Sequence, residues 1–166
     1  VATNPEGTVS VLEPSGKVTA YFDPTEKYVW SMIEGPKGLL IATGEPGRVL
    51  EVAAAGKSKL IFDPGETHIR ALIRHPTRGV IAGGGQKGIV YQLKPAGGAF
   101  ALYDSGMDEV TAFAIDPKSG DLYAAFVSET NPGSFVPEKS IGAVASDPAE
   151  TGAPIKGSEV VRISSS

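Results

Sequence analysis

The chain has no cysteine, and among its 166 residues only one is tryptophan, two are methionine and two are histidine. The absence of cysteine excludes disulfide bonds and thiolate metal sites. No apolar run approaches the roughly 20 residues that a membrane-spanning helix needs. A basic excess is also missing, since the formal net charge is −4. This balance argues against a nucleic-acid partner, because binding phosphates requires a basic face.

No signal peptide is visible, and the first residue is Val1 rather than Met. We therefore expect a mature form, a trimmed chain or part of a longer protein. A chain without cysteine is compatible with export. We expect an exported or periplasmic location rather than a cytoplasmic one.

Glycine and proline are plentiful, at 21 and 13 residues, which indicates many turns and therefore many short strands. No segment keeps a sustained apolar period of 3.6 residues, so no helix is expected. The fold class predicted from these features is all-β.

A repeat of 40 to 41 residues runs through the chain, with units that begin at Gly7, Gly47 and Gly88. Several other residue types keep the same step: Gly16, Gly56 and Gly97; Asp23, Asp63 and Asp104; Val29, Ile69 and Val110; Pro36, Pro76 and Pro117. Agreement among several residue types indicates one supersecondary unit that recurs along the chain.

Each unit contains four short β-type runs separated by turn residues. In the second full unit the runs are HIRALI (68–73), VIAGG (80–84), IVYQLK (89–94) and FALYD (100–104). Four strands in about 40 residues, repeated, are typical of β-propeller blades. The density of turns excludes a helical solenoid. A β-sandwich stays possible, although it has no reason to repeat at this step.

The predicted architecture is one partial propeller domain over 1–166, an arc of about four consecutive antiparallel blades with about 14 strands. The blades are expected at 1–23, 28–63, 68–104 and 109–163, the last with a loop insertion at 128–157. Val1–Thr3 is expected to be a strand, and the first and last blades to be incomplete. Such an arc exposes two apolar blade faces and open strand edges. Further blades, self-association or a protein partner would cover them.

Two segments carry a resemblance to a known family: AFAIDPKSGDLYAAF (112–126) and GIVYQLKPAGG (88–98). They resemble bacterial β-propeller repeats of the WD40-like, NHL and SMP-30/lactonase type. The resemblance extends over nearly all of the chain outside 128–157, and it implies a fold rather than an activity. The chain has neither the Trp-Asp nor the Gly-His pair of the eukaryotic WD40 repeats.

The connections between blades keep a common frame but carry different residues at DPTEKY (23–28), DPGETH (63–68) and DSGMDE (104–109). Variable positions in a fixed frame are where function is usually found, because the frame residues are needed for packing. In a propeller these connections share the top face. Seven residues there are candidates for ligand binding: Tyr28, Trp30, Glu66, His68, Arg70, Asp108 and Glu109.

Two interpretations of these residues stay open. Trp30 can stack on a sugar or a peptide, or it can fill the wall between two blades. The carboxylates of Glu66, Asp108 and Glu109 can form an oxygen-ligand Ca²⁺ site, although surface carboxylates are more often only solvated. No other cofactor is expected.

No catalytic residues and no transition-metal site are assigned. Gly-x-Ser-x-Gly does not occur in the sequence. The glycine-rich run 83–88 lacks the ending of a phosphate loop and aligns with 44–47 as a hairpin turn. His68 and His75 are expected on opposite faces, which argues against a histidine metal site.

Two functions follow as hypotheses. The first is a non-enzymatic binding or scaffold module that uses the top face or the exposed blade faces. The alternative is a metal-assisted lactonase or lyase, because propellers of the resembled type place acidic ligands around the channel mouth. The insertion 128–157, rich in Pro, Gly, Ser and Ala, is either a flexible spacer or a loop over the top face.

Overall fold

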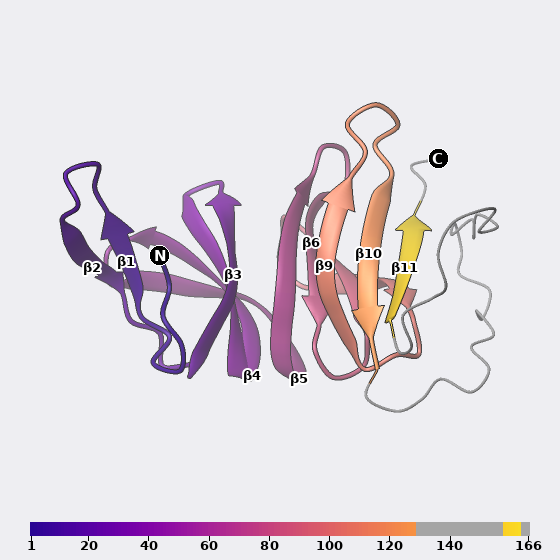
Figure 1. Cartoon of the computed structure of the whole chain (residues 1–166), viewed down its shortest axis with the longest axis horizontal. Helices are drawn as coiled ribbons and strands as arrows, with labels where there is room; N and C mark the ends of the chain where they lie inside the picture. The colour runs from indigo at the N-terminus through magenta and orange to yellow at the C-terminus, as the bar shows by residue number, and fades with distance from the viewer. Residues whose placement is uncertain (129–157, 164–166) are drawn as a thin grey trace.

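The computed structural model describes residues 1–128 and 158–163 (Figure 1). Every regular element in these two ranges is a β-strand, so the all-β expectation is confirmed. Within the same ranges no helix is long and apolar enough to cross a membrane. Most of the expected insertion, 129–157, lies outside the described residues.

The strands form three antiparallel sheets that follow one another along the molecule (Figure 1). The first sheet pairs β1 (Val9–Leu12) with β2 (Val18–Phe22). The second contains, in order, β3 (Tyr28–Gly35), β4 (Gly38–Ala54), β5 (Lys57–His75), β6 (Gly79–Gly84), β7 (Ile89–Leu93) and β8 (Ala99–Asp104). The third contains β9 (Glu109–Ile115), β10 (Leu122–Val127) and β11 (Ser158–Ile163), with β10 in the middle. None of the three described sheets closes on itself.

Two long strands replace four of the short strands expected from the sequence. The halves of β4 lie side by side, because a Cβ atom on Gly38 would be 2.1 Å from the carbonyl oxygen of Val52. The first half of β5 pairs with β4, and its second half pairs with β6. Val1–Thr3 contributes one isolated bridge, Ala2 to Val9, rather than a strand. The described residues therefore hold 11 strands, where about 14 short ones were expected.

β-bulges recur at the step of the sequence repeat. The register passes from Val29 to Ser31 in β3, which leaves Trp30 as the extra residue. Arg70 in β5 and Thr111 in β9 are the extra residues of equivalent bulges, 40 and 41 positions further along. A second series falls on the last strand of each unit, at Tyr21, Ile61 and Leu102. Because a bulge turns a side chain out of the regular alternation, the first series sets where Trp30 and Arg70 point.

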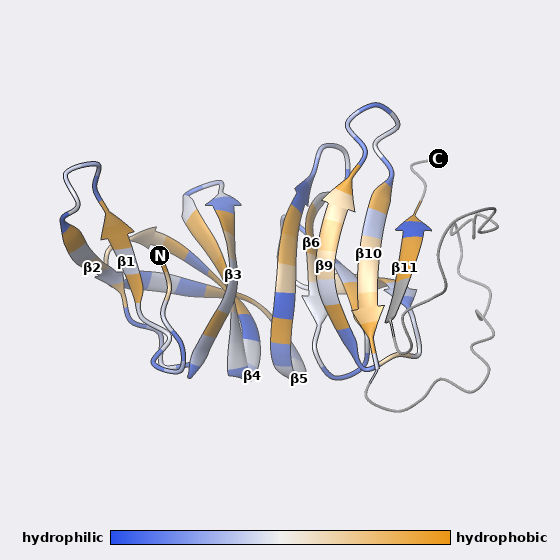
Figure 2. Ribbon diagram, viewed as in Figure 1, coloured by the Kyte–Doolittle hydropathy of each residue, from blue (hydrophilic) through white to orange (hydrophobic). Residues whose placement is uncertain are grey.

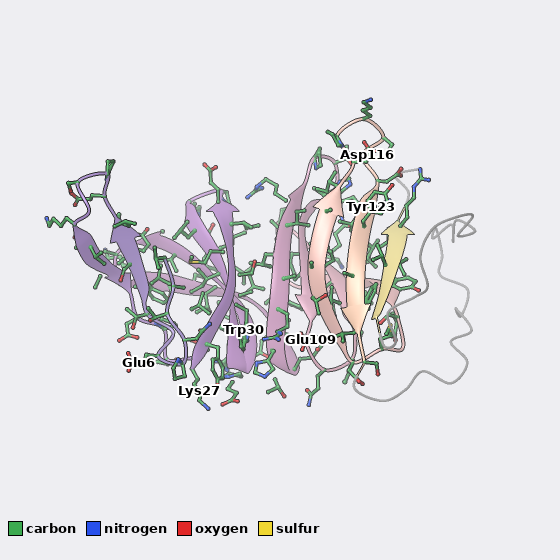
Figure 3. All side chains as sticks on the ribbon, in the orientation of Figure 1. Glu6, Lys27, Trp30, Glu109, Asp116 and Tyr123 are labelled. Atoms are coloured by element: carbon green, nitrogen blue, oxygen red, sulfur yellow. The ribbon has the colours of Figure 1, made fainter. Side chains whose placement is uncertain are left out.

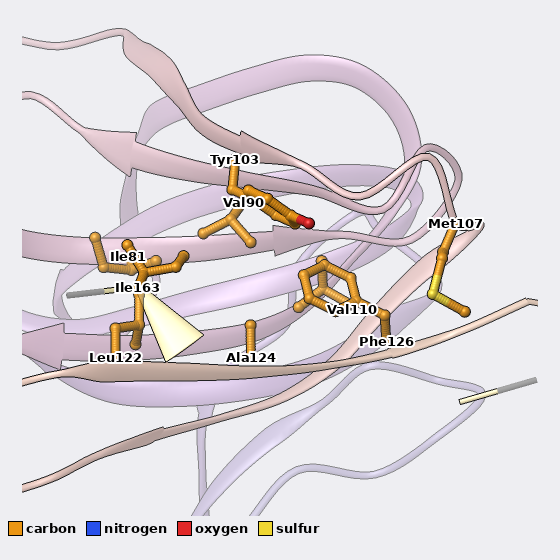
Figure 4. Close-up of a cluster of buried hydrophobic side chains, with 9 residues drawn as sticks. All are labelled: Ile81, Val90, Tyr103, Met107, Val110, Leu122, Ala124, Phe126 and Ile163. Atoms are coloured by element: carbon orange, nitrogen blue, oxygen red, sulfur yellow. The ribbon is translucent and has the colours of Figure 1, made fainter. Parts of the chain in front are cut away.

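The strands fall into four groups: β1–β2, then β3 and β4 with the first half of β5, then the second half of β5 with β6–β8, and finally β9–β11. Three hydrophobic clusters fill the spaces between successive strand groups. Equivalent residues of the repeat occupy them: Val9 and Val29, then Val49 and Ile69, then Val90 and Val110. The last cluster joins β6–β8 to β9–β11 through nine buried side chains, among them Phe126 and Leu122 (Figure 4). Figure 2 shows apolar residues alternating with polar ones along most strands. Each cluster holds two neighbouring groups together and fixes the positions of the connections between them.

Candidate functional site

Five of the seven candidate residues meet where β3, β5 and β9 come together. Tyr28 is the first residue of β3 and Glu109 the first of β9, whereas His68 lies within β5. Trp30 and Arg70 follow two positions after Tyr28 and His68, at the bulges. Trp30 and Glu109 lie at the same end of the strands in Figure 3. We call these five residues the strand-entry cluster.

The strand-entry cluster is a row of stacked and paired side chains. The rings of Tyr28 and Trp30 stack with centroids 4.9 Å apart and planes inclined by 20°. The guanidinium carbon of Arg70 lies 4.0 Å from the centroid of the Trp30 ring. Arg70 Nε donates to Glu109 Oε1 over 2.7 Å. The row thus runs from an aromatic stack through a cation to a carboxylate, and all four side chains are partly buried.

His68 closes the row from the side. Its ring meets Trp30 edge to face at 5.5 Å and 86°, and its Nδ1 accepts a hydrogen bond of 3.1 Å from Trp30 Nε1. An accepting Nδ1 places the proton of the neutral ring on Nε2. Burial, together with the charge of Arg70, lowers the pKa of His68. The ring is therefore held neutral, as the bond from Trp30 requires.

Gly44 makes this arrangement possible, although no sequence motif marks it as a site residue. Gly44 is the pairing partner of both Tyr28 and His68, so it lies between β3 and β5. A Cβ atom there would lie 2.2 Å from His68 Nδ1 and 2.3 Å from Trp30 Nε1. Only glycine leaves room for the bond between the two rings. The sequence places Gly44 in the hairpin turn 44–47, but it does not reveal the contacts of Gly44 with the two rings.

A second charged pair borders the aromatic stack. Lys27 Nζ donates to Glu45 Oε2 over 2.9 Å and lies 5.0 Å from the centroid of the Tyr28 ring. The hydrogen bond to Glu45 raises the pKa of Lys27. Both side chains are about half exposed, so the edge of the cluster that faces solvent carries one charge of each sign.

Glu66 does not join the cluster. It is 3% exposed and accepts hydrogen bonds from the Tyr91 hydroxyl and, over 3.1 Å, from the Gln86 backbone N–H. Burial, followed by the hydrogen bond to Glu66, raises the pKa of Tyr91. The carboxylate therefore joins the middle of β5, where Glu66 lies, to β7 and to the turn after β6. Glu66 thus has a role in packing.

Asp108 has a different partner, because its Oδ2 accepts a hydrogen bond of 2.7 Å from Ser128 Oγ. The carboxylates of Glu66, Asp108 and Glu109 thus have three different sets of partners. Within residues 1–128 and 158–163, no group of three or more His, Cys, Asp or Glu side chains is placed to hold a metal ion.

His75 lies at the far end of β5 from His68. It is 2% exposed, and its Nε2 is 2.7 Å from the carbonyl oxygen of Gly120 in the turn before β10. Its Nδ1 faces the backbone N–H groups of Thr77 and Arg78 at 3.3 and 3.2 Å. These contacts assign the proton to Nε2 and give His75 a structural role between two turns.

Comparison of the chain with protein-family models, with curated proteins and with solved structures finds no match.

Proposed function

We propose that this chain is a segment of a β-propeller that works as a non-enzymatic binding or scaffold module. Two observations support the propeller: bulges that recur every 40 or 41 residues, and clusters filled by equivalent residues between successive strand groups. In this proposal each strand group corresponds to a blade, and the blades pack face to face as propeller blades do.

The observation that carries the binding role is the outward face of β9–β11. Strand pairing places Ala112 opposite Ala125, Ala114 opposite Tyr123, and Val160 opposite Ala125, so these residues share one face. Phe113 and Val161, which alternate with them along β9 and β11, pack on the other side, against the buried cluster. Val160 is 67% exposed, and Ala112 and Ala114 are exposed as well.

A single exposed sheet face normally carries polar residues in alternation with the buried ones. Here small and apolar side chains occupy most of it, beside Tyr123 and Arg162, which lie opposite each other, and β9 and β10 appear mostly pale to deep orange in Figure 2. On β1 and β2, at the other end of the molecule, Leu12 and Val18 lie opposite each other and are 56% and 64% exposed. Contiguous apolar patches of this kind mark interaction surfaces. In the proposal, further blades or a second copy of the chain cover both faces.

The strand-entry cluster supplies a second surface suited to a protein partner. Tyr, Trp and Arg are the side chains most enriched where interfaces gain their binding energy. Here the three types are held rigid against one another by the stack, the cation–π contact and the ion pair. A rigid aromatic surface loses little conformational entropy when a partner binds.

The test is the mass of the isolated chain in solution, compared with that of surface variants. Ala114→Glu puts a charge on the outward face of β9, while Ala54→Glu makes the same change at an exposed position at the end of β4. The proposal expects Ala114→Glu alone to reduce association. If Trp30→Ala reduces association and Ala114→Glu does not, the strand-entry cluster rather than the open face is the interface.

A further inference from the structure

A hollow of about 600 Å³ lies at the end of the strands opposite the strand-entry cluster. β3 begins in the cluster at Tyr28, and the residues just beyond its last, Pro36 and Lys37, line the hollow. The other walls come from β4, β5, the turn before β6, and β7. A volume of this size is typical of pockets for small molecules.

The walls of the hollow are strongly basic, although the whole chain is acidic. One carboxylate, Glu51, and five basic side chains line it: Lys37, Lys59, Arg74, Arg78 and Lys94. The chain as a whole carries a formal charge of −4. Concentrating one sign of charge in a concave site raises the local concentration of ligands of the opposite sign. The hollow therefore favours an anion.

Glu51 provides a second, independent observation about the ligand of the hollow. It is 8% exposed, and β4 places it directly opposite Lys59 of β5. Within the two described ranges, neither a hydrogen bond nor an ion pair reaches its carboxylate. Its oxygens are not among the buried polar atoms of the described residues that lack a partner, so water reaches them, and a ligand hydroxyl can donate to the carboxylate in place of that water.

The other buried acidic residues show how unusual this is. Glu26 accepts from Arg48, Glu66 accepts from Tyr91, and Asp121 accepts from Arg162. Each of these carboxylates is at most 5% exposed and has its partner within the chain. Glu51 instead lines the basic hollow. The hydroxyl that replaces water on Glu51 is therefore expected to come from what the hollow binds.

Hydrogen bonds within the chain hold two of the side chains that line the hollow. Arg74 Nη2 donates to the carbonyl oxygen of Glu34 over 2.7 Å, which ties β5 to β3. Gln92 Nε2 donates to the carbonyl oxygen of Arg78, also over 2.7 Å, which ties β7 to the turn before β6. Leu40 and Leu93 add an apolar surface between the charged groups. The hollow thus offers cations, one acceptor and an apolar patch together.

We propose that this hollow binds a small hydroxylated organic anion, either a sugar acid or a sugar phosphate. The carboxylate or phosphate lies among the lysine and arginine side chains, and a ring hydroxyl donates to Glu51. The apolar patch contacts the C–H face of the sugar ring. Inorganic phosphate has no sugar ring that could reach Glu51 and the apolar patch while its charge lies among the basic side chains, and a neutral sugar lacks the charge for the basic walls. The site is separate from the apolar faces of the proposed function.

Isothermal titration calorimetry of the full chain at low ionic strength tests the assignment. Glucuronate and glucose 6-phosphate are the probes, and glucose and inorganic phosphate are the comparators. We expect at least one probe to bind about 10-fold or more tightly than both comparators, a difference of about 1.4 kcal/mol. The probe that binds more tightly shows whether the hollow prefers a sugar acid or a sugar phosphate. Absence of binding by both probes, or equal binding of phosphate, overturns the proposal.

Variants of two carboxylates give the matched comparison. Glu51→Gln removes the charged acceptor, whereas Glu34→Gln alters an exposed carboxylate on β3 outside the hollow. Glu51→Gln should weaken binding of the probe about 10-fold, because hydrogen bonds to charged groups are the stronger ones. Its melting temperature without ligand should not fall, since the replaced carboxylate has no partner to lose. Unchanged affinity in Glu51→Gln, or an equal loss in Glu34→Gln, contradicts the site.

Discussion

The guanidinium of Arg70 lies over the ring of Trp30, with its carbon 4.0 Å from the ring centroid. The same guanidinium donates to Glu109, so one side chain of β5 contacts a residue of β3 and a residue of β9. Trp30 and Arg70 are both bulged residues of the repeat, 40 positions apart. The bulges therefore direct side chains of neighbouring strand groups toward each other.

Replacing Arg70 by methionine should lower the free energy of unfolding by about 1–2 kcal/mol, because it removes a cation–π contact and a partly buried ion pair. A double-mutant cycle with Glu109→Gln, followed by urea denaturation, should give a coupling energy of about 1 kcal/mol. Arg70→Lys is the matched control, since it keeps the charge but not the planar stack. Strict additivity of Arg70→Met and Glu109→Gln would show that the pair is not coupled.

Trp30 is the only tryptophan, so its fluorescence reports on the strand-entry cluster. The pKa of His68 is lowered, chiefly by burial, and protonation of its Nδ1 would remove the acceptor for Trp30 Nε1. Trp30 emission should therefore change with a midpoint below the ordinary histidine value of about 6.5. His68→Gln should abolish the transition. A midpoint at or above that value would contradict the buried, neutral ring.

The same shift makes stability depend on pH with a defined sign. His68 binds its proton less readily in the folded chain than in the unfolded chain. Its contribution is therefore complete above about pH 6.5 and is lost as the pH falls through the lowered pKa. Urea denaturation at a series of pH values should show a decline in stability over that window. His68→Gln should make the decline smaller.

Gly44→Ala should disrupt the strand-entry cluster, because Gly44 lies between β3 and β5. The added methyl would lie 2.2 Å from His68 Nδ1, so the rings must separate, at an expected loss of about 1–3 kcal/mol. The loss should shrink in a His68→Ala background, because the ring that meets the methyl is gone. An equal loss in both backgrounds, measured by urea denaturation, would place the effect of Gly44→Ala elsewhere.

Tyr91→Phe should destabilise the chain by about 1–3 kcal/mol, because it leaves the buried Glu66 carboxylate short of a donor. Tyr123→Phe is the control, since this partly buried tyrosine lies on the outward face of β10. The raised pKa of Tyr91 gives a second readout, as this phenol should stay protonated while ordinary tyrosines ionise near pH 10. An equal effect of both substitutions on stability would remove the special role of Tyr91.

The repeat in the sequence predicted a large part of the fold. Val29, Ile69 and Val110 share one repeat position, and all three are buried between strand groups. Strand boundaries were harder to predict, since continuous pairing merges expected strands into β4 and β5. A turn rich in Gly and Pro signals a change of direction, but it does not show whether the ladder of hydrogen bonds is interrupted there.

The sequence predicted the meeting of some candidate side chains but not the partners of others. Tyr28, Trp30, His68, Arg70 and Glu109 meet because strand alternation and the recurring bulges bring their positions together. Glu66 was grouped with Glu109 from its place in a connection, yet its partner Tyr91 comes from another strand. The basic hollow joins residues of several strands that share no motif, so only the three-dimensional arrangement reveals it.

The most direct test of the proposed function is the mass of the unmodified chain, measured by size-exclusion chromatography with light scattering over a range of concentrations. The open apolar faces predict a mass above 17.1 kDa that rises with concentration. Ala114→Glu should shift the mass toward that value. A monodisperse species of 17.1 kDa at every concentration would contradict the account.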